Sequence, residues 1–382
     1  MMNRLFSTII SLVFCIAVSA QGTCVIKGTI ADDDKKIKNV TLVSTDDSGR
    51  EVEVAKAKVK KGKFTFKREL AKDEPVLMYT IKGLSRDVEV FVEVGEVTVV
   101  AGNQGLAWGT PTNDVLFKYK EICMEEHVAV SAKEKELAVN NGKEWLECAE
   151  GKAAMDKIKA REAIKNKSAR LRFLIDHNAS PMTPLEIERY LLPLLTPAYA
   201  EQMLKSVSTT LETHPYYLSL RNKVLAGNLK VGNEVPDIML PMLGGERKQL
   251  NDFRGKYVVL NFWANGCDKS APMIEELKNL HAVIKENNAE FVIVSFSFDT
   301  DKAAWTAAVN DNGMNLDGWL HACDGLGAES PAAKLLGVDK APRIVLIEPE
   351  GRAVSLDMDI DEVVMRVEQI LSGDLYYLDQ KE

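Results

Sequence analysis

The chain has 382 residues, of which 46% are hydrophobic and 27% charged, a composition typical of a globular protein with two or three domains. Its net charge of −8 and the lack of a basic cluster argue against nucleic acid as a partner. The five histidines show no ligand spacing with cysteines or carboxylates, so neither a metal nor another cofactor is expected.

The N-terminus has the pattern of a secretory signal peptide. Arg4 supplies a positive charge, residues 5–18 form an apolar run, and Val18-Ser19-Ala20 are small residues of a cleavage site. A membrane anchor is the alternative, but this run is short and is interrupted by serine and threonine. No later apolar run approaches the length of a membrane span. We therefore expect residues 1–20 to be removed and the protein to reside in the periplasm or cell envelope.

Residues 21–112 predict an all-β domain. Short apolar or alternating runs are separated by turn residues such as Lys61-Gly62-Lys63, which indicates a small antiparallel sandwich. The predicted strands lie at 25–30, 40–43, 52–54, 64–66, 76–81 and 88–94.

Residues 113–229 predict a helical region. Asn140-Asn141-Gly142 interrupts the helical pattern, and three later helices are expected to have a proline in their first turn, at Pro184, Pro197 and Pro215.

Residues 230–382 predict an α/β domain built around one strand, one turn and one helix. Tyr257–Phe262 is a nearly continuous apolar run, as expected for a strand that is covered on both faces. After Ser270 the apolar residues recur at helical spacing. Cys267 therefore lies at or just before the start of a helix, where unpaired N–H groups and the helix dipole favour a thiolate.

Cysteine usage also bears on function. Removing the leader with Cys15 leaves five cysteines. An odd number cannot all pair within one chain, so an exported protein keeps at least one free thiol or forms an intermolecular disulfide. Cys123 and Cys148 would lie about 16 Å apart along two antiparallel helices, too far for a disulfide. We expect these two cysteines and Cys24 to be buried.

The C-terminal pattern resembles the thioredoxin superfamily. Residues 262–270, Phe-Trp-Ala-Asn-Gly-Cys-Asp-Lys-Ser, are similar to the active-site turn F-W-A-x-W-C-x-x-C of the envelope branch, which is TlpA/ResA-like and related to AhpC/TSA. Further matches to this branch lie at 231–236, 250–256, 336–338, 341–342 and 346–351. Segments 62–66 and 109–114 resemble an uncharacterised β-domain that precedes thioredoxin folds in exported proteins of Gram-negative bacteria.

Three departures from the family pattern affect the chemistry. Ser270 stands where the family has its second cysteine, Gly266 where it has a tryptophan, and Met273 where the branch often has a glutamate. A dithiol reductase needs a second thiol to resolve a mixed disulfide and a base to deprotonate that thiol. The site is therefore a degenerate C-x-x-S motif rather than a standard dithiol.

The resemblance assigns roles to individual residues. Cys267 would be the nucleophile, with Lys269 favouring its anion and Ser270 offering a hydrogen bond to the sulfur. Pro342 would be the cis-proline opposite that cysteine. Substrate contacts fall on Ala341, Trp263 and Lys269, and Cys323 is the one candidate for a substitute resolving thiol. The hydroxyl that peroxiredoxins need three residues before their cysteine is replaced by Ala264.

Two functions remain open at this point. The first is an exported thiol-disulfide oxidoreductase with a monothiol site, acting on protein or small-molecule thiols and disulfides through a mixed disulfide. The second is a catalytically inactive thioredoxin-fold module that binds a partner. A fast-reacting Cys267 thiol with a low pKa favours the first function, and a slow or protected thiol favours the second.

Overall fold

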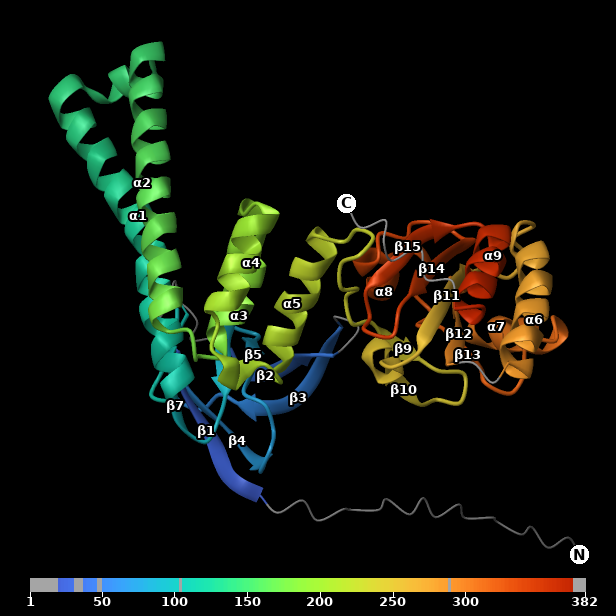
Figure 1. The fold of residues 1–382 in the computed structure, drawn as a ribbon. Helices are drawn as coiled ribbons and strands as arrows, with labels where there is room; N and C mark the ends of the chain where they lie inside the picture. Colours follow the sequence, from blue (N-terminus) through green and yellow to red (C-terminus); the bar gives the residue numbers. More distant parts are fainter. Residues whose placement is uncertain (1–19, 31–36, 47–49, 103–104, 288–289, 374–382) are drawn as a thin grey trace, which may run out of the picture. The chain divides into compact units, whose positions relative to one another are not determined.

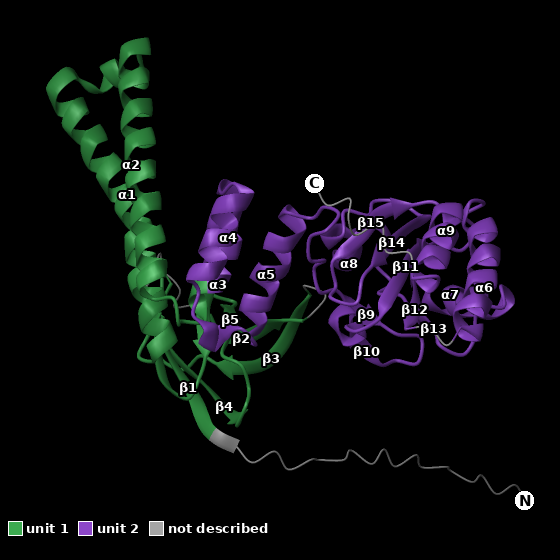
Figure 2. Ribbon diagram, viewed as in Figure 1, with its two compact units in different colours: residues 1–183 green, residues 184–382 purple. Residues whose placement is uncertain are grey.

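The computed structural model describes residues 20–30, 37–46, 50–102, 105–287 and 290–373 (Figure 1). The chain divides into two compact units, residues 1–183 and 184–382 (Figure 2). The predicted leader lies outside the described residues except for Ala20, with which strand β1 begins. The predicted helical region contributes to both units, and the domain limits at 112/113 and 229/230 stay predictions.

Two four-stranded sheets form the N-terminal β region. One sheet has the order β4-β1-β7-β8 and contains β1 (Ala20–Ile30), β4 (Lys63–Ala71), β7 (Gly95–Ala101) and β8 (Leu106–Trp108). The other has the order β3-β2-β5-β6 and contains β2 (Asn39–Thr45), β3 (Glu51–Lys58), β5 (Leu77–Lys82) and β6 (Val88–Val92). A single apolar core takes Ile26 and Phe66 from the first sheet and Leu42 and Ile81 from the second. The two sheets therefore pack face to face, and the predicted strand-rich region is confirmed.

A long helical hairpin follows this β region. Helix α1 (Pro111–Asn141) is joined to α2 (Ala149–Asp176) by the short 3-10 helix η2 (Lys143–Glu147). Buried Asn113 ties α1 to β6 because its amide accepts from the Phe91 N–H at 2.9 Å and donates to the Phe91 carbonyl at 2.8 Å. Cys123 lies half-buried on α1, whereas Cys148 is exposed at the start of α2, so the expectation that Cys148 is buried was wrong. No helix in the described ranges is both long and apolar enough to cross a membrane.

Shorter helices lead into the C-terminal domain. They are α3 (Met182–Glu186), the π-helix η3 (Ile187–Leu191), η4 (Leu192–Leu194), α4 (Pro197–Ser206), η5 (Thr209–Leu211) and α5 (Pro215–Gly227). Helices α4 and α5 begin at the predicted prolines, since proline at the first position loses no helical hydrogen bond.

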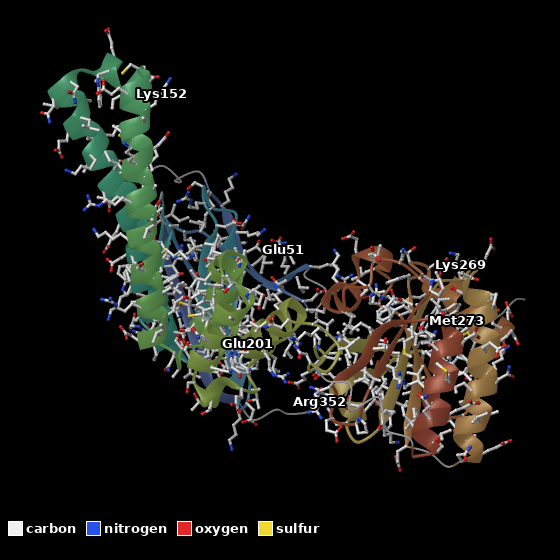
Figure 3. The ribbon with its side chains drawn as sticks, turned by 45° about the horizontal axis from the view of Figure 1, so that its top comes forward. Glu51, Lys152, Glu201, Lys269, Met273 and Arg352 are labelled. Carbon is white, nitrogen blue, oxygen red and sulfur yellow. The ribbon has the colours of Figure 1, made fainter. Side chains whose placement is uncertain are left out.

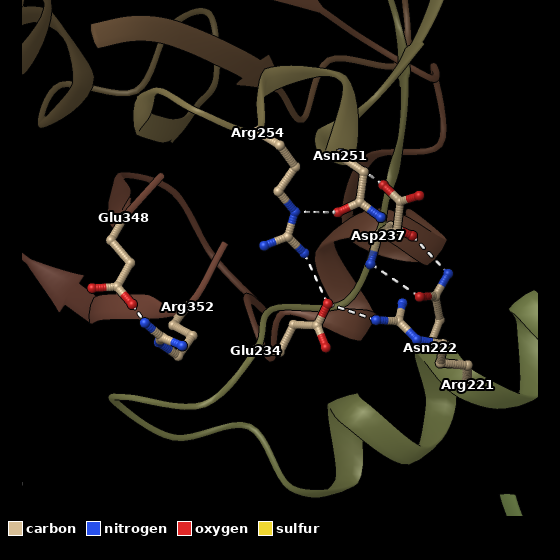
Figure 4. A network of polar contacts seen from close by, with 8 residues as sticks. All are labelled: Arg221, Asn222, Glu234, Asp237, Asn251, Arg254, Glu348 and Arg352. Carbon is tan, nitrogen blue, oxygen red and sulfur yellow. Dashed lines mark hydrogen bonds and ion pairs between the residues drawn. The ribbon is translucent and has the colours of Figure 1, made fainter. Parts of the chain in front are cut away.

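Helix α5 is fastened to the segment that enters the C-terminal sheet (Figure 4). Glu234 accepts hydrogen bonds from Arg221 Nη2 at 2.5 Å and from Arg254 Nη2 at 2.8 Å. The Asn222 amide donates to the Asp237 carbonyl at 2.7 Å and accepts from the Asp237 N–H at 3.0 Å. These bonds make α5 a structural part of the C-terminal unit.

The C-terminal domain contains a five-stranded mixed sheet with the order β13-β12-β11-β14-β15. Its strands are β11 (Tyr257–Trp263), β12 (Phe291–Ser297), β13 (Trp319–Ala322), β14 (Arg343–Ile347) and β15 (Ala353–Met358). Strand β11 runs parallel to β12 and antiparallel to β14, and β12 runs parallel to β13. A separate hairpin, β9 (Met239–Pro241) with β10 (Arg247–Gln249), precedes the sheet and is followed by η6 (Leu250–Phe253).

Helices cover both faces of this sheet, as the predicted fold class requires. Helices α6 (Ser270–Glu286), α7 (Lys302–Asp311) and α9 (Ile360–Leu371) share one core with Val259 and Trp263 of β11. The opposite core joins Val258, Leu260 and Phe262 to the β9–β10 hairpin and to α8 (Pro331–Leu335), which follows η7 (Gly327–Glu329). The burial of both faces explains why β11 is apolar apart from Asn261, whose side chain accepts from the Ser295 hydroxyl at 2.7 Å.

We expect cavity filling to stabilise the β region. A cavity of about 160 Å³ lies between its sheets, lined by Cys24, Leu42, Ala55 and Phe66 among others. Ala55→Val adds two methyl groups to this space and should raise the free energy of unfolding by about 1 kcal/mol in urea denaturation. Ala57→Val, on the same strand but outside the cavity lining, is the matched control for strand propensity. Equal effects of the two variants would contradict the prediction.

We also expect stability to fall in mild acid because of His321. This residue is buried on β13, and burial lowers the pKa of its imidazole below 6.5. Below about pH 6.5 the unfolded chain therefore binds a proton that the folded chain rejects, and stability decreases as the pH falls. Urea midpoints followed by tryptophan fluorescence between pH 7 and 5 should drop less in His321→Gln than in the natural protein. Parallel pH slopes would contradict this.

Candidate active site around Cys267

The turn that carries Cys267 joins β11 to α6 at the carboxyl edge of the parallel strands. The Cys267 N–H donates to the Ala264 carbonyl at 3.3 Å, and the Ser270 N–H donates to the Cys267 carbonyl at 2.9 Å. These two successive turns end in helix α6, which begins at Ser270 with Lys269 as its N-cap. The structure thus has Cys267 just before a helix N-terminus, as the sequence pattern indicated.

The backbone of this turn favours glycine beside the cysteine. Gly266 has φ +74, in the left-handed region, and a Cβ built on it would meet no atom within 4 Å. Space is therefore available, but the backbone conformation is one that bulky side chains rarely adopt. The Gly266 position is exposed, and glycine brings no side chain of its own beside the cysteine.

The Ala341–Pro342 peptide bond is cis and lies beside the Cys267 thiol. The Sγ atom of Cys267 contacts the Ala341 carbonyl oxygen at 3.9 Å. Strand β14 brings these residues there, because its pairing with β11 aligns Arg343 with Phe262. Cys267, Ala341 and Pro342 are all partly exposed, so a molecule from solvent can approach the sulfur and the loop together.

Electrostatics at the turn favour the thiolate. The pKa of the Cys267 thiol is lowered from 9.0, mainly because the neighbouring Ser270 hydroxyl can donate to the thiolate and then because of the backbone N–H groups of Lys269 and Ser270, against some desolvation and the opposing charge of Asp268. The Ser270 side chain is 2% exposed, and its Oγ has no hydrogen-bond partner of good geometry in the structure. A thiolate on Cys267 would supply the acceptor that this buried hydroxyl lacks.

Two of the expected site residues lie in the core. Trp263 is 1% exposed and packs against α6 and α7, so the expectation that it contacts substrate is corrected: at the end of a strand covered on both faces it serves as packing. Cys323 is also 1% exposed and forms no disulfide with Cys267. Its thiol donates to the Asp299 carbonyl at 3.2 Å, and burial raises its pKa.

Two further positions of interest lie at the start of α6. Lys269 is exposed at the start of α6, and Met273 is buried in its first turn, which excludes a base at that position (Figure 3). In the described part of the chain, no three His, Cys, Asp or Glu side chains are grouped to hold a metal ion. Asp299 was not expected at the site, yet its carboxylate contacts the Cys267 turn. Its place two residues after the end of β12 was the available signal.

Parts of the chain are similar to known domains and proteins. Residues 255–353 match the family described as thioredoxin-like, and residues 24–116 match the domain of unknown function DUF4369. The chain is 26% identical over 140 residues to the thiol-disulfide oxidoreductase ResA of Bacillus subtilis (strain 168), covering 36% of this chain and 74% of that protein. It is 39% identical over 70 residues to ResA of Oceanobacillus iheyensis, which is 17% of this chain and 36% of that protein.

One solved structure similar to part of this chain is a thiol-disulfide oxidoreductase from Bacteroides fragilis NCTC 9343. The two have 28% sequence identity and a TM-score of 0.34, and the match covers 36% of this chain and 99% of that one. By the family models alone, a thioredoxin-like domain lies in the C-terminal region, at residues 255–353, and a DUF4369 domain lies in the N-terminal β region, at residues 24–116.

We predict that Ser270 controls the reactivity of Cys267. Ser270→Ala removes the main hydrogen-bond donor to the thiolate, so the pKa of Cys267 should rise toward 9.0. Alkylation by iodoacetamide at pH 7, followed on the Cys267 peptide by mass spectrometry, should slow about fivefold, which corresponds to roughly 1 kcal/mol for one hydrogen bond. Ser208→Ala, which removes a helix-capping hydroxyl far along the chain, is the control. An unchanged rate in Ser270→Ala would contradict this role.

Proposed function

We propose that this protein is an exported thiol-disulfide oxidoreductase that works with one thiol, Cys267. The observation that carries the proposal is the half-buried Cys267 sulfur, with a lowered pKa, in contact with the Ala341 carbonyl beside cis-Pro342. The leader-like residues 1–20 support action in the periplasm or cell envelope. The likeness of the C-terminal domain to proteins named thiol-disulfide oxidoreductase supports disulfide exchange as the reaction class.

The reaction follows from the chemistry of a single thiolate. The Cys267 thiolate attacks one sulfur of a partner disulfide, the S–S bond breaks, and the second partner sulfur leaves as a thiolate. Ser270 stabilises the Cys267 thiolate but has no sulfur with which to displace the bound partner. The mixed disulfide therefore persists until an external thiol attacks it, regenerates Cys267 and becomes part of a new disulfide.

The surface beside the sulfur suits an extended partner segment. The backbone of Ala341 lies at the rim of the site and is partly exposed, so it can pair with the main chain of a peptide that carries the disulfide. Lys269 is exposed next to the cysteine and can attract a negative charge near the attacked sulfur. Cys323 is not given a resolving role, because it is buried and its pKa is raised.

Trapping the intermediate tests this proposal. The full chain in a Cys148→Ser background, which removes an exposed thiol, is mixed with a peptide that contains one intramolecular disulfide. Intact-mass measurement should find a protein–peptide adduct that is absent in Cys267→Ala. Ser270→Cys restores a second thiol and should instead give reduced peptide and an intramolecular disulfide in the protein.

The opposite result would favour the binding module. If the folded protein forms no adduct between pH 6 and 9, whereas the urea-unfolded protein does, Cys267 is protected from exchange. The thioredoxin fold would then serve only as a surface for partner binding.

A further inference from the structure

The carboxylate of Asp299 is bound to the backbone of the Cys267 turn. Its two oxygens accept from the Asn265 N–H, Oδ1 at 3.1 Å and Oδ2 at 3.3 Å. Asn265 lies inside the turn from Ala264 to Cys267, which is the first of the two successive turns before helix α6. Apart from this bond, the Asn265 position is exposed.

The strand register places the two residues together. Strands β11 and β12 are parallel, with Trp263 paired to Ser297, so Asn265 and Asp299 each follow their strand's last residue by two positions. Carboxyl ends of parallel strands meet at one edge of a sheet, where neighbouring loops contact one another.

Asp299 is itself held from two sides. The buried Ser297 hydroxyl donates to Asp299 Oδ2 at 2.7 Å and accepts from the Asp299 N–H at 2.9 Å. The Cys323 thiol donates to the Asp299 carbonyl oxygen at 3.2 Å. With its main chain and its carboxylate both fixed, Asp299 offers the Asn265 N–H an acceptor of defined position.

We propose that Asp299 is a positioning residue for Cys267: it fixes the backbone at Asn265, in the turn from Ala264 to Cys267, and thereby holds the sulfur where the N–H groups of the next turn reach it. Cys323 then acts as a support for Asp299 rather than as a reacting thiol. The inference rests on the proposed function only in naming Cys267 as the reacting group.

The consequence for the thiol is specific. The backbone N–H groups of Lys269 and Ser270 lower the pKa of Cys267 only while the turn aims them at the sulfur. In a more mobile turn these N–H groups would bond to the sulfur for only part of the time, and the pKa of Cys267 would rise toward 9.0. A residue that supported only the fold would leave this quantity unchanged.

The test compares the pH profile of Cys267 alkylation by iodoacetamide in the full chain and three variants. Asp299→Ala should shift the profile to higher pH and slow the reaction at pH 7 at least about threefold, the effect of losing a fraction of one hydrogen bond. Asp299→Asn keeps an oxygen acceptor and should recover most of the rate. Asp301→Ala is the matched control, because Asp301 caps α7 two residues further on, without a hydrogen bond to the Cys267 turn.

A second measurement begins with the natural protein. The Asn265 amide, followed by NMR hydrogen exchange, should be protected even though the residue is exposed, and Asp299→Ala should reduce that protection. Three results would each overturn the proposal. The first is an alkylation profile of Asp299→Ala that superimposes on that of the natural protein, and the second is an equal shift of the profile in Asp301→Ala. The third is an Asn265 amide that exchanges without protection.

The test of the Asp299 positioning role does not depend on whether the protein catalyses disulfide exchange. If the natural protein forms no mixed disulfide but Asp299→Ala still changes the Cys267 profile, the positioning role stands and the exchange function fails. If exchange occurs but the profile does not depend on Asp299, only the positioning role fails.

Discussion

The pairing of β11 with its two neighbours is the constraint on which the site depends. On one side β14 runs antiparallel and aligns Arg343 with Phe262, which delivers the Ala341 carbonyl to within 3.9 Å of the Cys267 sulfur. On the other side β12 runs parallel and delivers the Asp299 carboxylate to the Asn265 N–H. A shift of either register by one residue would reverse the side-chain directions and separate these groups.

The turn retains the features that activate one thiol and lacks those that release a product. Backbone N–H groups at the start of α6 and the Ser270 hydroxyl all favour a thiolate on Cys267. A buried Met273 occupies the place where a base would be expected, and Cys323, which directly follows β13 in the same sheet, is a buried thiol that supports the Asp299 loop. Such an arrangement suits the formation of a mixed disulfide better than its resolution.

The rest of the chain is held together by apolar packing and by polar contacts between its elements. The β region has a single apolar core between two sheets, and the long α1–α2 hairpin is joined to it through buried Asn113. Helix α5 belongs instead with the thioredoxin-like domain, to which Arg221 and Asn222 bind it (Figure 4). The helical region is thus divided by its polar contacts, which no hydrophobic period along the sequence reveals.

The sequence by itself determined the strand-rich, helical and α/β regions and the position of Cys267 before a helix, because local periodicity, turn residues and a family motif are all readable within short segments. Only the tertiary structure decided that Trp263 and Cys323 are buried, that Cys148 is exposed, and that Asp299 binds the Cys267 turn. Those outcomes depend on which face of a strand meets which helix and on which loops meet at a sheet edge. Such contacts join residues far apart in the chain, so local patterns do not contain them.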